Sequence, residues 1–125
     1  MSTLRKIKAA AAIIDKGLWA QGGFTYEEQR INTRTGRRMI KSNPVTCFCA
    51  AGALREGETR EGASRAFGLS DYGDAVKIFL KAIRKPHGSE EDIWNWNDNK
   101  RRTFAQVRNA FKRAVKIAER EAKAA

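Results

Sequence analysis

Two cysteines one residue apart, Cys47 and Cys49, open a run of small residues that predicts a buried helix beginning near Thr46. The free amides and the dipole at a helix N-terminus stabilise a thiolate, and a nucleophilic cysteine can be built in this way. Such a nucleophile also needs a base, and the only histidine, His87, lies in a Pro-His-Gly turn. Free cysteines are commonly small buried hydrophobes, so we expect both thiols to be structural.

The sequence does not favour a disulfide or a zinc site at the two thiols. A disulfide between such close neighbours would be strained, and two cysteines do not make a disulfide framework. A zinc ion would find at most three soft ligands in Cys47, Cys49 and His87, without a paired C-x-x-C motif. The sequence therefore predicts reduced cysteines, no metal and no cofactor.

Three tryptophans, Trp19, Trp94 and Trp96, form a second group of candidates. Exposed aromatic side chains beside basic residues stack on bases and bind single strands with little sequence preference. Aromatic side chains of small domains mostly pack in the core, and we expect this of Trp19 and Trp94. Trp94 and Trp96 cannot share one helical face, so at least one of the two should be partly exposed. Asn97 and Asp98 are expected to cap or cross-link the loop before the last helix.

The third group is basic. The chain carries 25 Lys and Arg against 14 Asp and Glu, a net charge of +11, with a balance of +6 over residues 1–46, −2 over 47–99 and +7 over 100–125. This asymmetry favours a polyanionic partner, most simply nucleic acid bound non-specifically, or else an acidic host protein. No base-reading motif accompanies the charge. The candidate contact residues lie in a predicted hairpin, before the last helix and on it: Arg34, Arg37, Arg38, Lys41, Lys100, Arg101, Arg102, Arg108 and Lys112.

Length and hydropathy limit the class of protein. With 125 residues, the chain is expected to form a single domain over residues 1–125, its last few residues frayed. No apolar run approaches the ~18 residues of a membrane helix. The short N-terminal apolar stretch, Ala9 to Ile14, is followed by charges and lacks a convincing cleavage site, so we expect a cytoplasmic protein without a signal peptide.

The candidate residues need elements to position them. Apolar spacing predicts a first helix over residues 3–16, stopped by Gly17. Residues 24–26 and 38–40 are predicted to be two strands of a small hairpin, with a turn at residues 32–36. The small-residue helix that opens near Thr46 is predicted to end at Gly57, and a short helical piece to follow at residues 58–67.

Three capping signals mark the remaining helices. Ser70 is a candidate N-cap of a helix that Pro86 and Gly88 close, and Ser89 begins another that ends at residues 97–99. Thr103 and the glutamine three residues later form a capping-box pattern before the last helix. The apolar face of that helix is predicted to contain Phe104, Val107, Phe111, Ala114, Val115 and Ala118. The expected fold is mainly α (α+β), with about five helices and one small β-hairpin in a single compact domain.

Four short stretches of the sequence stand out together: Trp19-x-Gln21-Gly22, Cys47-x-Cys49-Ala50-x-Gly52-Ala53-Leu54, Trp96-Asn97-Asp98, and Arg102-Thr103 with Val107, Phe111 and Ala114 downstream. They resemble a small domain family of unknown function, which occurs in bacteriophages and in bacteria, notably actinobacteria. Family members usually carry an Arg-Asp-x-x-Gly stretch where this chain has a longer basic segment from Phe24 to Lys41. The similarity spans about residues 4–120 and implies a phage-like origin, without an established activity, cofactor or catalytic residue.

Three functional hypotheses follow from the sequence. The leading one is a phage-type, non-enzymatic accessory protein of the bacterial cytoplasm that binds nucleic acid through a basic hairpin and the C-terminal helix. The first alternative is a protein-binding inhibitor or modulator of a host or defence complex. The second alternative is a small cysteine enzyme.

Overall fold

A computed structural model describes residues 3–22, 25–26, 29–31, 34–36, 38–40, 47–60 and 69–124. Within these ranges there are five helices: α1 (Thr3–Asp15), α2 (Ala50–Arg60), α3 (Leu69–Ala82), α4 (Glu90–Asp98) and α5 (Phe104–Ala124). The same ranges hold two two-stranded sheets, made by β1 (Thr25–Tyr26) with β4 (Cys47–Phe48) and by β2 (Gln29–Ile31) with β3 (Arg38–Ile40). The prediction of a mainly helical fold with about five helices is confirmed.

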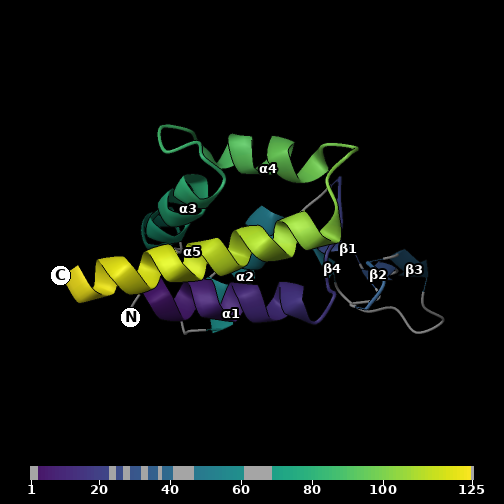
Figure 1. Cartoon of the computed structure of the whole chain (residues 1–125), viewed down its shortest axis with the longest axis horizontal. Coiled ribbons are helices and arrows are strands. Elements are labelled where there is room, and N and C mark those ends of the chain that lie inside the picture. Colours follow the sequence, from purple (N-terminus) through teal and green to yellow (C-terminus); the bar gives the residue numbers. More distant parts are fainter. Residues whose placement is uncertain are drawn as a thin grey trace.

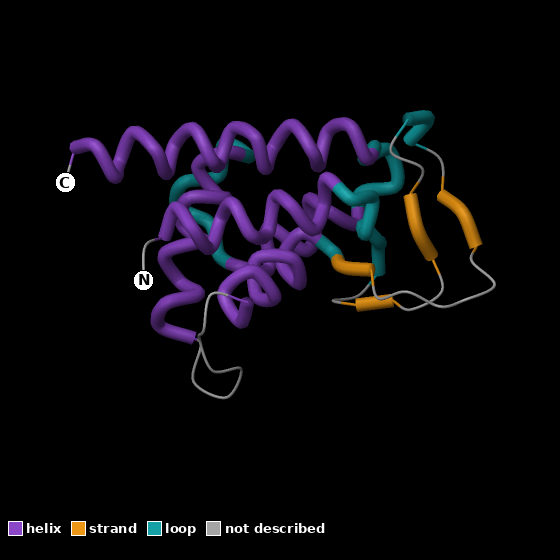
Figure 2. The backbone as a smooth tube through the Cα atoms, turned by 90° about the horizontal axis from the view of Figure 1, so that it is seen from below, coloured by secondary structure: helices purple, strands orange, loops and turns teal. Residues whose placement is uncertain are grey.

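The long helix α5 crosses the front of the bundle beside α1, with α2 behind them and α4 above (Figure 1). The two front helices run antiparallel, because α1 begins at the end of the bundle where α5 finishes. Helix α1 packs on both α2 and α5, and α3 packs on α5. The strands lie at the end of the bundle opposite the start of α1, where α4 ends and α5 begins (Figure 2).

Helix α1 forms where its apolar spacing predicts. One face of the helix lies in the core, because buried residues recur at three- and four-residue intervals: Ile7, Ala10, Ile13 and Ile14. The helix ends at Asp15, just before the expected stop at Gly17. Gly17 has a φ of +82°, a left-handed conformation that favours glycine. The Gly17 N–H donates to Ile14 O at 2.8 Å and closes the last turn.

The predicted start of α2 near Thr46 is wrong, because the helix begins at Ala50. Cys47 and Phe48 form strand β4 instead. The Phe48 N–H donates to Leu18 O at 2.8 Å, and Phe48 O accepts the Ala20 N–H at 2.9 Å. These lateral bonds use the backbone groups that a helix would need, so the helix can only begin after them.

The predicted stop at Gly57 is also wrong, since α2 continues to Arg60. Residues 58–60 of the predicted helical piece belong to α2, and residues 61–68 lie outside the described ranges. A Cβ atom at Gly57 would lie 2.7 Å from Lys6 O and 2.8 Å from Ala10 N. The glycine therefore allows α1 and α2 to approach at backbone distance, which is a packing role and not a terminating one.

The hairpin exists, but the pairing predicted for it is wrong. Strand β3 pairs antiparallel with β2, so that Arg38 lies opposite Ile31 and Ile40 opposite Gln29. The other predicted strand, β1, pairs with β4, 22 residues further along the chain. The turn falls as expected at its described residues 34–36, where Gly36 has a φ of +73°.

The first of the three capping predictions, an N-cap at Ser70, is wrong. Helix α3 begins at Leu69, one residue before the predicted N-cap. It ends at Ala82, before the predicted Pro86 and Gly88. Arg84 is left-handed with a φ of +63°. The Arg84 and Lys85 N–H groups donate to Lys81 O (3.1 Å) and Leu80 O (2.8 Å), the two bonds of a Schellman motif.

The other two capping predictions are confirmed. At α4, the Ser89 N–H donates to Asp92 Oδ2 at 2.8 Å, and the helix ends at Asp98. At α5, the Thr103 N–H donates to Gln106 Oε1 at 3.0 Å, and the Gln106 N–H donates to Thr103 Oγ1 at 3.1 Å. These reciprocal bonds satisfy amides that the helix itself leaves without partners.

The predicted apolar face of α5 lies in the core, except that Val115 is only partly buried. The Phe111 side chain is 1% exposed, and its ring centroid lies 4.6 Å from that of Phe79 on α3. The packing of α5 against α3 therefore depends on this aromatic pair.

Replacement of Phe111 by alanine should lower the free energy of unfolding by roughly 3–5 kcal/mol, because a fully buried ring leaves a cavity. Lys112→Ala, at the next and exposed position of the same helix, should change it by less than about 0.5 kcal/mol. Urea denaturation of both variants measures the difference. A loss below about 1 kcal/mol for Phe111→Ala would contradict the packing described.

Candidate functional site

The sequence motifs converge on one buried side chain, Asn97 at the end of α4. Its Oδ1 accepts the Trp19 indole N–H at 2.7 Å and the Ala50 backbone N–H at 2.9 Å. Its Nδ2 donates to Ala20 O at 3.0 Å and to Asp98 Oδ1 at 3.0 Å. All four hydrogen-bonding capacities of the amide are therefore filled, and the residue is fully buried.

A second layer of contacts joins the same segments. The Gln21 side-chain Nε2 donates to Asn97 O and to Asn99 O, each at 2.8 Å. The Gly22 N–H donates to Asp98 Oδ1 at 2.8 Å. Gln21 thus satisfies carbonyl oxygens that the C-terminus of α4 leaves without helical partners.

This network explains the unusual strings as structural. Asn97 holds the first amide of α2, the strand-like segment after α1 and the end of α4 in one place. The expectation that Asn97 and Asp98 cap or cross-link the loop before the last helix is wrong in its partners. Their side chains join the segment after α1 and the start of α2 to the end of α4. We name these contacts of Trp19, Gln21, Ala50, Asn97 and Asp98 the Asn97 network.

Arg102, a candidate contact residue, is tied into the fold beside this network. Its Nε donates to Trp96 O at 2.9 Å, and its guanidinium lies 4.2 Å from the centroid of the Trp96 ring. Trp96 also meets Phe79 edge-on, with ring centroids 5.6 Å apart. Arg102 therefore closes the end of α4 and covers an aromatic side chain of the core.

The three tryptophans divide between core and surface. Trp19 is 3% exposed, as predicted, whereas the core prediction for Trp94 is wrong, because its side chain is 38% exposed. Trp96 is partly buried and packs against the core. The helical period puts Ile93 and Asn97 on the buried side of α4, which turns Trp94 away from it.

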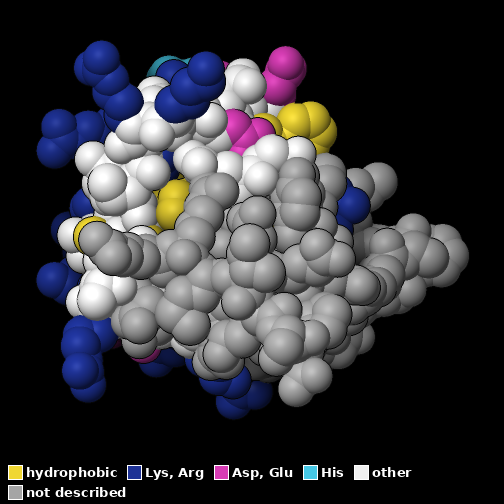
Figure 3. Space-filling view, turned by 90° about the vertical axis from the view of Figure 1, so that its right-hand side faces the viewer, with side chains coloured by type: hydrophobic (Ala, Val, Ile, Leu, Met, Phe, Trp, Pro, Cys, Tyr) yellow, Lys and Arg dark blue, Asp and Glu magenta, His cyan; other side chains and the backbone are white. Residues whose placement is uncertain are grey.

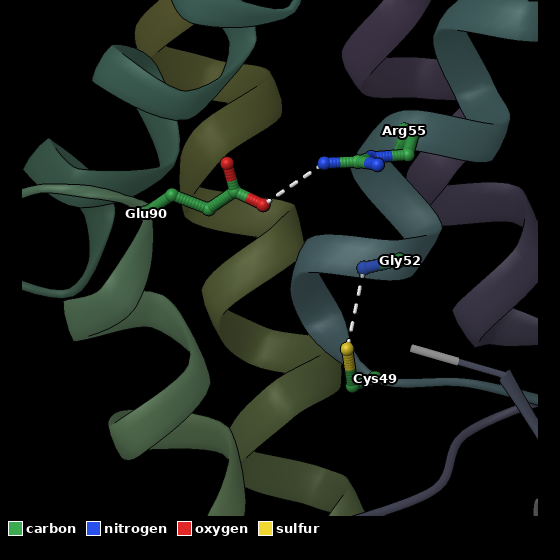
Figure 4. A network of polar contacts seen from close by, with 4 residues as sticks. All are labelled: Cys49, Gly52, Arg55 and Glu90. Carbon is green, nitrogen blue, oxygen red and sulfur yellow. Dashed lines mark hydrogen bonds and ion pairs between the residues drawn. The ribbon is translucent and has the colours of Figure 1, made fainter. Parts of the chain in front are cut away.

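Both cysteines are buried, and neither forms a disulfide. Cys49 precedes the first residue of α2, and its Sγ accepts the Gly52 N–H at 3.3 Å, in place of the usual hydroxyl or carboxylate cap (Figure 4). Burial raises the pKa of the Cys49 thiol to about 11, although the Gly52 N–H acts in the opposite direction. The neutral thiol is therefore the form present at neutral pH, and it is a poor nucleophile.

His87 belongs to a different part of the molecule. It lies in the loop between α3 and α4 and lines a groove of about 530 Å³, together with residues at the start of α1 and near the end of α5. Cys49 is not among the residues that line this groove. In the described ranges, no three side chains of His, Cys, Asp or Glu are grouped as a metal site requires.

Several basic side chains are used to join helices. Arg55 of α2 lies 3.3 Å from Glu90 of α4 (Figure 4), and Lys81 of α3 lies 3.2 Å from Glu121 of α5. Arg108, a candidate contact residue, lies 2.7 Å from Asp15 of α1. The Arg113 Nε donates to Ala82 O at 3.1 Å, at the end of α3. These charges serve the fold.

A second set of basic side chains projects from α5 without such contacts. At about 100° per residue, these side chains lie within one narrow sector of the helix surface, and all are exposed. None of them forms an ion pair with another described residue. We name this set the α5 stripe: Lys112, Lys116, Arg120 and Lys123. Glu119 lies in the same sector of the helix and lowers the net positive charge of that surface.

Further basic side chains line the edge of the molecule on the side of α5 and α1 (Figure 3). Figure 3 shows described Lys and Arg side chains along its left edge, which is the front of Figure 1, where α5 and α1 lie. Asp and Glu side chains appear mainly near the top of the same view. Lys100 and Arg101 are exposed in the loop that leads into α5.

The remaining candidates lie in the hairpin. Arg34 is exposed at its turn, and Arg38 belongs to β3. Arg37 and Lys41 lie outside the described residues. Three members of the α5 stripe are not among the candidates predicted from the sequence: Lys116, Arg120 and Lys123. Their spacing on the polar face of the last helix is the signal that could have added them.

Replacement of Asn97 by alanine should lower the free energy of unfolding by roughly 3 kcal/mol or more, because the buried Trp19 and Ala50 N–H groups each lose their acceptor. Asn95→Ala is the matched control, since it makes the same change at an exposed position of α4 and should cost less than about 0.5 kcal/mol. Denaturant unfolding compares the two. Similar losses in both variants would show that the Asn97 network does not hold the fold.

The raised pKa of Cys49 should appear in the pH dependence of stability. Above about pH 9 the unfolded thiol loses its proton while the folded thiol keeps it, so alkali favours unfolding until about pH 11. Over this window the free energy of unfolding should fall by roughly 1.4 kcal/mol per pH unit more in the unmodified chain than in Cys49→Ala. Denaturant curves under reducing conditions measure both slopes. Equal slopes would mean that the folded thiol has an ordinary pKa.

None of the helices in the described ranges is both long and apolar enough to span a bilayer. No characterised protein and no solved structure matches the chain. The profile of one known family, described as "Family of unknown function (DUF6197)", matches residues 1–117. This match covers every segment that meets in the Asn97 network, and the chain belongs to this family of unknown function.

Proposed function

We propose that the chain is a non-enzymatic protein that binds nucleic acid without sequence preference, through phosphate contacts along the α5 stripe. The observation that carries the proposal is the division of the basic side chains. Arg55, Lys81, Arg102, Arg108 and Arg113 make contacts within the fold, whereas the α5 stripe forms no ion pair with any described residue.

The geometry of the stripe suits a polyanion. Lys112, Lys116 and Arg120 are four residues apart, so they stand about 6 Å from one another along the helix axis, and Lys123 extends the row to about 17 Å. The helix that carries them is capped by Thr103 and packed against α1 and α3. The charges are therefore held in a fixed row, and little entropy is lost by the backbone on binding.

Neighbouring charges add to this surface. Lys100 and Arg101 precede α5, and the β2–β3 hairpin with exposed Arg34 lies at the same end of the bundle in both views. A loop and a helix of one sign of charge raise the local concentration of a polyanion by electrostatic attraction. We include these residues in the proposal as secondary contacts. We also propose that the protein is of phage type and acts in the bacterial cytoplasm.

Two rival functions receive less support. A cysteine nucleophile would need a thiolate, and burial of Cys49 favours its neutral form. An acidic protein partner would also be attracted by the stripe. However, the stripe is made mostly of lysine and lacks the exposed aromatic anchors that are enriched in specific protein interfaces.

The double variant Lys112→Ala/Lys116→Ala should bind DNA and RNA more weakly than the unmodified chain. If each lysine neutralises one phosphate, the slope of log affinity against log salt should become shallower by about two units. Fluorescence anisotropy between about 50 and 200 mM salt measures both quantities. Lys77→Ala/Lys85→Ala is the control, because it removes two exposed charges that lie outside the stripe and form no ion pair with a described residue.

Two results would count against the proposal. The first is an absence of binding by the unmodified chain to either nucleic acid at about 50 mM salt, where non-specific phosphate contacts are strong. The second is an equal salt slope for the stripe variant and its control, which would place the contacts elsewhere on the molecule.

A further inference from the structure

In the described part of the chain, most aromatic side chains that could stack on bases are used inside the fold. Trp19 is buried and hydrogen-bonded to Asn97, and Trp96 is partly buried in contact with Arg102 and Phe79. Phe104 and Phe111 are buried on the core face of α5. In the described part of the chain, Trp94 is the one large hydrophobic side chain that is exposed.

Trp94 lies on an acidic surface and not on the α5 stripe. Glu90 and Asp98 are four residues before and after it on α4, so all three side chains share one side of that helix. Glu91 adds a further exposed carboxylate in the first turn. A phosphate backbone would be repelled here, so Trp94 does not extend the stripe with a stacking surface.

A surface that offers cations without stacking platforms favours one form of nucleic acid. Proteins that bind single strands combine a basic groove with aromatic side chains on which successive bases stack. A duplex instead buries its bases and presents one charge per ~1.7 Å of its axis, so that phosphate contacts alone supply the affinity. The α5 stripe has the second set of properties.

The residue types in the stripe point the same way. Lysine is a point charge on a flexible stem, whereas arginine, asparagine and glutamine make the bidentate contacts that read base edges. Three of the four members of the stripe are lysines, and the Asn97 amide is consumed by the fold. Contacts of this kind position a duplex without reading its sequence.

We propose that the nucleic acid bound by the α5 stripe is double-stranded, held through its phosphates, and that Trp94 takes no part in binding. This inference rests on the proposed function, which concerns nucleic acid in general. It goes further, because it names the form of nucleic acid and excludes the side chain best suited to stack on single strands.

The test compares three probes of about 20 nucleotides or base pairs, several times longer than the stripe: a mixed-sequence DNA duplex, the same duplex with its sequence scrambled, and one of its strands. The two duplexes should bind equally within about twofold, and the single strand should bind at least about tenfold more weakly. Trp94→Ala should bind all three probes as the unmodified chain does.

The outcomes separate this inference from the function on which it rests. A single strand that binds as tightly as the duplex, or weaker single-strand binding by Trp94→Ala, would overturn the inference and leave nucleic-acid binding in place. A preference of more than about tenfold between the two duplexes would overturn the absence of base reading. If the unmodified chain binds none of the three probes and does not bind a matching RNA duplex either, the proposed function itself is overturned.

Discussion

The side-chain amide of Asn97 is the contact on which the arrangement of the helices depends. A buried amide that lacks partners costs more than it contributes, whereas one with every donor and acceptor satisfied selects a single arrangement of its neighbours. Asn97 meets this condition through Trp19, Ala20, Ala50 and Asp98. The position of α4 relative to α1 and α2 therefore follows from hydrogen-bond geometry as well as from apolar burial.

This structural role separates the conspicuous residues from the candidate site. Tryptophan, glutamine, cysteine and asparagine are the types that first suggest chemistry, yet here they cap helices, fill the core and join segments. The residues that we propose for binding are three lysines and one arginine on one helix. They stand out only once the structure shows which other basic side chains contact the fold. Arg102 and Arg108 show this most clearly, because sequence alone groups them with the exposed charges, whereas the structure ties them to Trp96 and Asp15.

Local signals allowed much of the fold to be predicted. The capping box at Thr103, the stop at Gly17 and the apolar face around Phe111 depend on neighbours within four residues, and all three are confirmed. The errors concern contacts distant in sequence. Strand β4 forms because Phe48 pairs with the segment after α1, and Gly57 serves an approach by α1. For the site, the distribution of charge along the chain predicted a basic last helix, but not which of its charges are consumed by the fold.

Hydrogen exchange at the Trp19 indole N–H tests the role of the Asn97 network most directly. If the network is part of the cooperative core, this proton should exchange only through global unfolding, and its exchange free energy should equal the free energy of unfolding from denaturant curves. The Ala50 amide, which donates to the same oxygen, should give the same value. Exchange at either group through a local opening that costs well under half of the global free energy would contradict the account.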